Sequence, residues 1–338
     1  MKNLSFINKI IYLINNIFAL LFLASFAIPH IAPKTFPLLS VLSLAVPFLI
    51  LIHVIFIIYW WIIGVKKQFL LSALCIALAV LFSYFPYKFS SKKVVSGDDL
   101  AVMSYNVRMF NRYNWIDTKD VPGKINDFVK KADPDILSVQ EYYVIDGFKI
   151  DYPYKYTVLD EKKHNTGQAI FSKFRIINKG SLGFKNSNNN AIFIDVIKGA
   201  DTIRIYNIHL ETTGIKPSDE LIGEEESKRL IGRISKSFVK QQDQVEKIRT
   251  HKNNCTYKVI ITGDFNNTAY SWAYHHIKGD MKDSFLEAGE GFGGTYNFHK
   301  YPLRIDFILV DKKFNVNQFT NFDEGFSDHL PIMARISH

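Results

Sequence analysis

Residues 259–270 read VIITGDFNNTAY and join a strand pattern to polar residues. The first four residues are β-branched, which is typical of a buried strand. Gly263 ends this run, and Asp264 and Asn266 follow it. One interpretation is a turn, because Gly and Asn tolerate positive φ angles and Asp caps the segment that follows. The other is that the strand delivers a carboxylate and an amide to a reaction site.

The first quarter of the 338-residue chain is much more apolar than the remainder. Three apolar stretches cover roughly residues 10–28, 36–63 and 69–85, and no acidic residue precedes Asp98. Because a bilayer core takes about 20 apolar residues per helix, we predict a membrane domain of residues 1–87 with three transmembrane helices. A cleaved signal peptide would account for one such stretch but not for three. Buried helices of a soluble core are the remaining alternative.

The net charge of +9 arises almost entirely in this N-terminal part. Residues 1–97 hold eight lysines and no acidic residue, so they carry +8. The other 33 of the 41 basic residues share the rest of the chain with all 32 acidic residues. This near-neutral balance weakens the case for long duplex DNA as a partner. Cys75 and Cys255 lie in the two different parts, so they do not reveal the redox compartment.

The remainder of the chain alternates strand-like and helix-like segments. Residues 88–97, KFSSKKVVSG, are mostly small and polar, and we interpret them as a linker. Residues 98–338 are long enough for one large core. Short apolar runs at 100–107, 135–142, 167–174, 190–197, 202–210, 258–265, 304–310 and 331–337 predict strands, and residues 220–250 predict an amphipathic helix. Many strands with few helices between them predict an α+β fold with two packed sheets and helices outside.

Polar residues follow several of these strands. They are Asn106, Gln140, Glu141, His209, Asp264, Asn266, Asp306, Ser327, Asp328 and His329. Each has an ordinary structural explanation when it is taken alone, such as a turn, a surface charge, a hydrogen-bonded strand histidine or a helix cap. Their repetition at strand ends favours a single site.

In this order, the polar residues resemble the motifs of the endonuclease/exonuclease/phosphatase superfamily, which has the deoxyribonuclease I-like fold. That family has an Asn on its first strand, Gln-Glu on the next, a strand histidine, Gly-Asp-x-Asn, an Ile-Asp-aromatic strand and a terminal Ser-Asp-His. The resemblance covers roughly residues 98–338 and does not extend to the first 97. It implies a four-layered α/β sandwich with the site at the rim where the two sheets meet.

The resemblance also implies a divalent cation. Glu141 would be the first ligand, with Asn106 beside it and Asp328 nearby. Oxygen ligands of this kind suit Mg²⁺ or Mn²⁺. The sequence lacks the clustered His and Cys residues of a zinc cage.

Hydrolysis of a phosphate ester requires an oriented water molecule and groups that neutralise the phosphoryl oxygens. We expect Asp264 to orient or deprotonate the water and Asn266 to donate to a phosphate oxygen. His329 would donate to the same phosphate, with its tautomer fixed by Asp306. His209 would complete the phosphate-binding group.

These features predict a membrane-anchored, divalent-metal-dependent phosphoesterase that hydrolyses a phosphodiester or a phosphomonoester, a nuclease included. The implied partners are the bilayer and a phosphate-ester substrate, either nucleic acid or a phospholipid head group, and no protein partner. The alternative is a phospholipid head-group phosphodiesterase or phosphatase. A third hypothesis is a catalytically idle binding module, but such a module is expected to lose a metal carboxylate or the last histidine, and this chain retains Glu141, Asp264, Asp328 and His329.

The lysines that flank the apolar stretches bear on topology. Lys2 and Lys9 precede the first stretch, and Lys66 and Lys67 lie in a tight connection before the third. If these lysines are cytoplasmic, three spans place the catalytic domain outside the cytoplasm, and this is the arrangement we predict. Four other lysines favour the opposite arrangement, namely Lys34, Lys88, Lys92 and Lys93.

Overall fold

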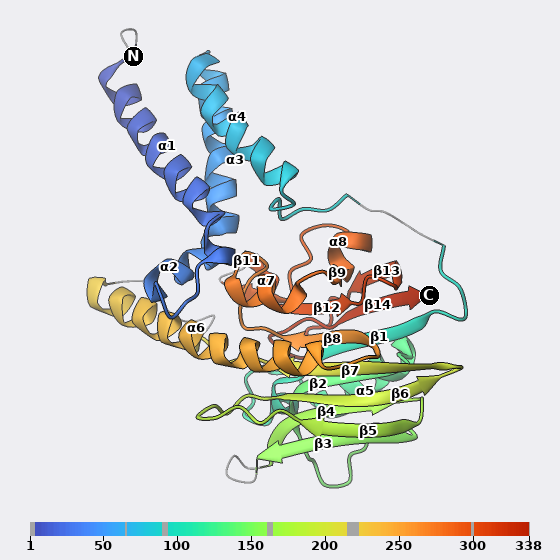
Figure 1. Ribbon diagram of the computed structural model, residues 1–338. Coiled ribbons are helices and arrows are strands. Elements are labelled where there is room, and N and C mark those ends of the chain that lie inside the picture. The colour runs from blue at the N-terminus through green and yellow to red at the C-terminus, as the bar shows by residue number, and fades with distance from the viewer. Residues whose placement is uncertain are drawn as a thin grey trace.

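The computed structural model describes residues 4–64, 66–89, 94–160, 165–214, 223–298 and 301–337 (Figure 1). A group of apolar helices stands on a larger body of two sheets with helices outside them. The N-terminal elements are α1 (Phe6–Ser25), η1 (Ile28–His30), α2 (Pro37–Val41), η2 (Leu42–Leu44), α3 (Val46–Ile62) and α4 (Lys66–Leu81). We call this part, residues 4–64 and 66–89, the N-terminal module.

Two six-stranded sheets form the centre of the larger body. The first has the order β13-β14-β1-β2-β4-β3 and the second the order β5-β6-β7-β8-β12-β9. The strands of the first sheet are β1 (Leu100–Asn106), β2 (Ile136–Tyr143), β3 (Tyr154–Asp160), β4 (Thr166–Ser172), β13 (Asn315–Asn321) and β14 (Ile332–Ser337). The strands of the second are β5 (Ile176–Ser181), β6 (Ala191–Lys198), β7 (Asp201–His209), β8 (Lys258–Asp264), β9 (Lys282–Asp283) and β12 (Asp306–Val310). A separate hairpin joins β10 (Tyr296–Phe298) and β11 (Tyr301–Leu303), and the other helices are η3 (Arg108–Asn111), α5 (Val121–Ala132), α6 (Glu224–Asn253), α7 (Trp272–Lys278) and α8 (Ser284–Ala288).

Side chains alternate between the two faces of each strand and so build three core layers. Val102 of β1 and Ile260 of β8 point into the layer between the two sheets. Met103 points to the opposite face of β1, where it packs with residues of α5. Ile261 likewise packs on the outer side of β8, in the layer that contains residues of α6 and α7. The result is a helix–sheet–sheet–helix arrangement, which confirms the predicted α/β sandwich.

The helices of the N-terminal module are joined by polar contacts in their interior. Asn15 of α1 donates to Ser72 of α4 at 2.9 Å and accepts from the indole of Trp60 of α3 at 3.1 Å. His53 of α3 lies 3.1 Å from the same Ser72 hydroxyl. Polar residues inside an apolar helix bundle hold helices together in this way, which explains why Asn15 and His53 occur within the apolar stretches.

The structure supports one of the three predicted transmembrane helices and does not support three. Among the described residues, Phe6–His30 is the helix that is long and apolar enough to cross a membrane by itself. The second apolar stretch is divided into Pro37–Leu44 and Val46–Ile62, which are bent by 57°. Its first half packs on α6 instead of continuing the axis of α3. The third stretch forms α4, whose 16 residues extend about 24 Å, short of a hydrocarbon core of about 30 Å.

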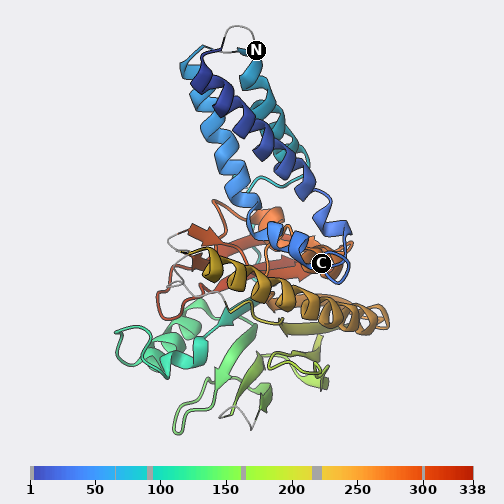
Figure 2. The same cartoon turned by 90° about the vertical axis from the view of Figure 1, so that its left-hand side faces the viewer.

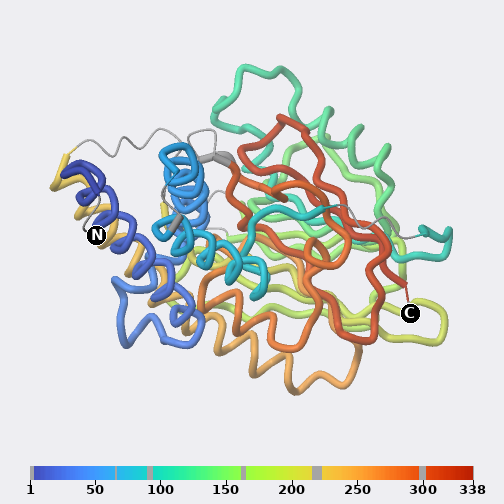
Figure 3. Tube along the Cα trace, turned by 90° about the horizontal axis from the view of Figure 1, so that it is seen from above, coloured from blue at the N-terminus to red at the C-terminus, as the bar shows by residue number. Residues whose placement is uncertain are grey.

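The predicted linker, residues 88–97, is partly paired with the larger body. Lys88 exchanges two backbone hydrogen bonds with Gly291, at 2.8 and 2.9 Å. Residues 90–93 lie outside the described residues. Seen from above, the N-terminal module lies over one end of the sandwich, the end at which α6 begins (Figure 3).

Candidate active site

Strands from both sheets end at one edge of the sandwich and carry polar side chains there. In the second sheet, β7 places His209 opposite Asp264, and β12 places Asp306 opposite the same residue from the other side. In the first sheet, β1 ends at Asn106 beside Gln140 of β2. Because side chains alternate along a strand, these side chains lie on the face of each strand that is directed toward the other sheet. They therefore converge where the two sheets meet. Figure 2 looks onto this side of the molecule.

Asp264 lies at the centre of this group and is 1% exposed. Its Oδ1 accepts the backbone N–H of Asn266 at 2.7 Å, and its Oδ2 accepts from Asn106 Nδ2 at 3.1 Å. The Nε2 atoms of His209 and His329 lie 3.6 and 3.7 Å from Oδ2. Burial raises the pKa of Asp264, and the neighbouring His329 opposes this rise.

His329 is held between two carboxylates. Its Nδ1 lies 2.9 Å from Asp306 Oδ2, and its ring packs 5.0 Å from that of Tyr296. Burial alone would lower the pKa of His329, but Asp306 and Asp264 together raise it. The imidazole is therefore stabilised as a cation, with Nε2 directed toward the Asp264 side of the site.

Glu141 reaches the site through an irregularity in β2. The pairing of β2 with β4 shifts register between Val139 and Tyr142, and Glu141 has a φ of +50°. Such a bulge changes which face the following side chains occupy. Val139 and Tyr142 accordingly both pack toward α5, although regular alternation would place them on opposite faces. Burial and the nearby Asp328 raise the pKa of the Glu141 carboxyl.

The other two predicted metal ligands flank Glu141. Asn106 Nδ2 donates to Glu141 Oε1 at 3.3 Å, and its Oδ1 accepts the backbone N–H of Arg108 at 3.1 Å. Asp328 forms an ion pair with Arg108, with Nη1 and Oδ2 2.9 Å apart. The Ser327 hydroxyl donates to the Asn106 carbonyl at 2.8 Å and so joins the last loop to β1.

Asn266 occupies a left-handed backbone conformation, with a φ of +48°. Its side-chain amide donates to the Leu210 carbonyl at 3.0 Å and to Asp264 Oδ2 at 3.3 Å. The turn and the site interpretations of residues 263–266 therefore describe one local structure. In this structure the amide of Asn266 fixes the Asp264 carboxylate and the chain after β7.

A buried amide network beneath the site was not anticipated from the sequence. Gln140 Nε2 donates to Asn207 Oδ1 at 2.7 Å. Asn207 in turn donates to the carbonyls of Val139 and Ala169 at 2.8 and 3.0 Å, so it bonds from β7 to two strands of the facing sheet, β2 and β4. The sequence does contain a signal for Asn207, because it precedes His209 by two residues and so lies on the same face of the strand. Arg108, whose guanidinium lies 4.3 Å from the Trp115 ring centroid, was also missed as a partner of Asp328.

A groove of about 680 Å³ opens beside these residues. Glu141 and His209 line it together with polar residues of the segments around β3, β4 and residues 187–190. Neutral amides and hydroxyls contribute much of this lining, among them Gln168, Ser187 and Asn189. A substrate can therefore approach the Asp264 region from the side of the sandwich.

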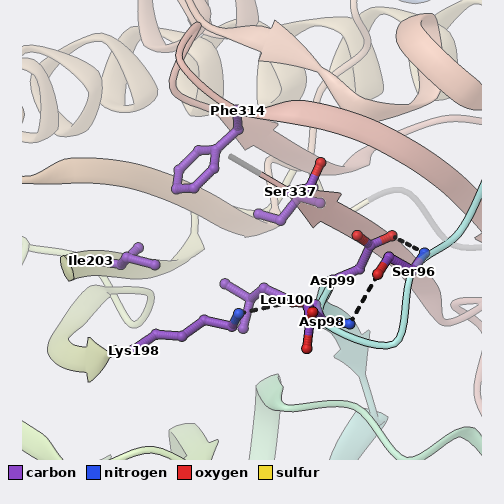
Figure 4. Close-up of a pocket in the computed structure, with 9 residues that line it drawn as sticks. Ser96, Asp98, Asp99, Leu100, Lys198, Ile203, Phe314 and Ser337 are labelled. Atoms are coloured by element: carbon purple, nitrogen blue, oxygen red, sulfur yellow. Dashed lines mark hydrogen bonds between the residues drawn. The ribbon is translucent and has the colours of Figure 1, made fainter. Parts of the chain in front are cut away.

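A second pocket, of about 240 Å³, lies at the opposite ends of the strands (Figure 4). Leu100 and Ile203, near the starts of β1 and β7, line it. Lys198 donates to the Asp98 carbonyl there at 2.8 Å. None of the predicted site residues lines this pocket, so it forms no part of the site.

Comparison with known proteins defines the class. Residues 103–329 match the model of the Endonuclease/Exonuclease/phosphatase family, whose members are phosphoesterases and nucleases. The chain belongs to this family. Residues 8–85 match a second model, described as a domain of unknown function (DUF8431). No curated relative matches the sequence.

Several solved structures share the fold. Humanized D. rerio TDP2 is 15% identical, with a TM-score of 0.54, and the match covers 72% of this chain and 100% of that one. A mannosyl-6-phosphatase of Bacteroides thetaiotaomicron VPI-5482 is 20% identical, with a TM-score of 0.51, covering 71% and 100% of the two chains. The catalytic domain of human Nocturnin is 19% identical, with a TM-score of 0.51, covering 72% and 96%.

Gly263 tests whether the local structure before Asp264 is required. Its φ is +133°, and an added Cβ would lie 1.9 Å from the Ile208 carbonyl oxygen. We expect Gly263→Ala to lower the free energy of unfolding by more than about 2 kcal/mol, because both strain and a backbone clash result. Chemical denaturation of the full chain in detergent measures this loss.

Gly232 provides the matched control. It lies in α6, and nothing lies within 4 Å of an added Cβ. Gly232→Ala should be neutral or stabilising by about 0.5–1 kcal/mol. Equal stabilities of the two variants would contradict the strand geometry described here.

Proposed function

We propose that the protein is a membrane-anchored, divalent-metal-dependent phosphoesterase that cleaves a phosphodiester or a phosphomonoester. The observation that carries this proposal is the position of Asp264, a buried carboxylate that lies between His209 and His329 and is fixed by Asn106. A carboxylate held in this way can orient or deprotonate an attacking water molecule. The histidines can then donate to phosphoryl oxygens.

The donor set around Glu141 fits a hard divalent cation. Glu141 and Asp328 offer carboxylate oxygens, whereas Asn106 directs its Nδ2 to Glu141 and its Oδ1 to the Arg108 N–H, so its amide would have to turn to join them. Burial and the nearby Asp328 both raise the pKa of the Glu141 carboxyl. A bound Mg²⁺ or Mn²⁺ would neutralise charge on the phosphoryl group and on the leaving oxygen. We propose that these three residues hold it.

A second group of potential ligands is less suited to a metal. Asp264, Asp306 and His329 offer ligand atoms that all lie within 4.8 Å of one another. A metal-binding histidine must be neutral, whereas the two carboxylates raise the pKa of His329. We therefore assign this group to the water molecule and the phosphate.

Membrane anchoring is supported by the exposure of apolar side chains in the N-terminal module. Phe6 of α1, Trp61 of α3 and Leu81 of α4 are 77%, 74% and 73% exposed. Burial of such a side chain stabilises it by roughly 1.5–3 kcal/mol, so a surface with many of them favours a lipid environment. The low burial of the apolar window of α1, 22%, disfavours a helix inside a soluble core.

The metal-dependence test uses the full chain in detergent with bis-p-nitrophenyl phosphate as substrate. We expect hydrolysis only with Mg²⁺ or Mn²⁺, and we expect Glu141→Gln to abolish it because one anionic ligand is lost. Glu224→Gln is the control, since that side chain is 82% exposed on α6. Full activity in excess chelator would exclude the metal assignment.

Replacement of Asp264 tests the central carboxylate. Asp264→Asn keeps the shape but removes the base, and such losses cost about 10²–10⁴ in rate. We therefore expect kcat to fall within that range while the circular dichroism spectrum is unchanged. Asp280→Asn, at a side chain that is 70% exposed, should leave kcat unaltered. Near-normal turnover of folded Asp264→Asn would leave residues 263–266 with only their turn role.

Topology is tested by reporter fusions at the C-terminus of the full chain in a bacterial host. We propose that the catalytic domain lies outside the cytoplasm, on the basis of Lys9, which lies near the start of the spanning helix α1. Alkaline phosphatase, which is active only after export, should then be active, and green fluorescent protein at the same point should be dark. The reverse pair of results would place the catalytic domain in the cytoplasm.

A further inference from the structure

The N-terminal module rests directly on the segment that follows Asp264. We call this segment, residues 265–271, the β8–α7 loop. The Thr268 hydroxyl donates to the Ser43 carbonyl of η2 at 2.9 Å, and the Ser43 hydroxyl lies 3.3 Å from Asn267 Oδ1. Ser43 is 0% exposed, and Asn267 and Thr268 are 2% exposed. These hydrogen bonds are therefore shielded from water, where loss of a partner leaves a polar group unsatisfied.

A relay of hydrogen bonds continues from this contact to the site. Asn267 Nδ2 donates to Gln241 Oε1 of α6 at 2.9 Å, and Gln241 Nε2 donates to the Phe265 carbonyl at 3.2 Å. The same amide reaches the Glu211 carbonyl, after β7, at 2.8 Å. Gln241 is 1% exposed. One buried amide thus bonds the Asp264–Asn266 turn at Phe265 and the chain after β7 at Glu211. The module contacts Asn267, which is a partner of that amide.

Apolar contacts reinforce the same junction. Tyr270 of the β8–α7 loop belongs to the core cluster of the module, together with Phe22 of α1 and Val46 of α3. Its hydroxyl donates to the Tyr84 carbonyl at 2.9 Å, and the two rings lie 5.1 Å apart. The loop therefore contributes a side chain to the interior of the module.

The backbone of the turn requires such support. Asn266 has a φ of +48°, and a non-glycine residue in that region costs on the order of 1 kcal/mol unless its surroundings hold it there. One side of the loop is held by strand pairing of Asp264 with β7 and β12. Gln241 of α6 and Ser43 of the module hold the loop from the other side.

We propose that the N-terminal module is part of the catalytic unit: η2, through Ser43, positions the β8–α7 loop and hence Asp264 and Asn266. This inference rests on the proposed function. Ser43 and Thr268 are positioning residues, since they act through the loop and touch no reacting atom. The consequence is that a change in how the module sits in its membrane alters turnover more than substrate affinity.

The test compares Thr268→Val with Thr268→Ser in the full chain in detergent. Val keeps the shape of Thr but removes the donor to the Ser43 carbonyl, whereas Ser retains it. Because a buried hydrogen bond is worth about 0.5–1.5 kcal/mol, we expect Thr268→Val to lower kcat about 3- to 10-fold with KM nearly unchanged. Thr268→Ser should restore most of kcat.

Asp243→Asn is the matched control at the same junction. Asp243 pairs with Lys34 of the module but is 65% exposed and lies on α6, away from the loop. Its loss should weaken the junction by at most the small amount typical of exposed ion pairs and should leave kcat unchanged. An equal fall of kcat in Thr268→Val and Asp243→Asn would show a general loosening and overturn the positioning role.

Amide hydrogen exchange gives a readout that does not require activity. In Thr268→Val, a peptide covering residues 263–270 should exchange faster than in the wild type, and a peptide from β6 and β7 should not. Unchanged exchange in residues 263–270, or faster exchange with normal kcat, would overturn the proposal.

If the wild type hydrolyses no phosphate ester, the proposed function fails. The exchange result then decides alone, with faster exchange supporting the coupling and equal exchange refuting it.

Discussion

A carboxylate buried between two sheets dictates much of this structure, because a buried charge is tolerated only with hydrogen-bond donors and compensating charges around it. Asp264 obtains donors from its own turn and from Asn106 of the facing sheet. The cationic His329 supplies compensation, and Asp306 in turn supports His329. Loss of a donor would leave the Asp264 carboxylate with fewer hydrogen bonds, and loss of His329 would leave its charge uncompensated. The edge of both sheets is therefore organised around one side chain.

Strand alternation explains how much of this arrangement could be predicted. Asn106, His209, Asp264 and Asp306 all lie on regular strands, and their inter-sheet face follows from the period of two. The two packed sheets follow from the strand pattern, whereas the position of these residues at one edge was implied by the resemblance to the family. The long helix α6 was also indicated by its spacing of apolar residues.

The features that could not be predicted depend on irregular backbone or on contacts between distant segments. Glu141 enters through a bulge and a positive φ, which no periodic pattern specifies. The pairing of Asp328 with Arg108 joins segments more than 200 residues apart. Residues 36–63 look continuous by composition, yet they bend between η2 and α3, where Pro47 lies in the first turn of α3 and Ser43 of η2 accepts a hydrogen bond from Thr268. Hydropathy alone contains no information about that bond.

The inter-sheet core changes character along its length, and this change explains why the site is rigid. Far from the site, Val102 and Ile260 fill the space between the sheets with apolar contacts, which are non-directional. Toward the site, Gln140 and Asn207 replace them with hydrogen bonds whose lengths and angles are restricted. These hydrogen bonds run from β7 to β2 and β4, so they restrict the separation of the two sheets at this point. Asn106 of the first sheet can therefore meet Asp264 of the second at a distance that the fold sets, and not the movement of side chains.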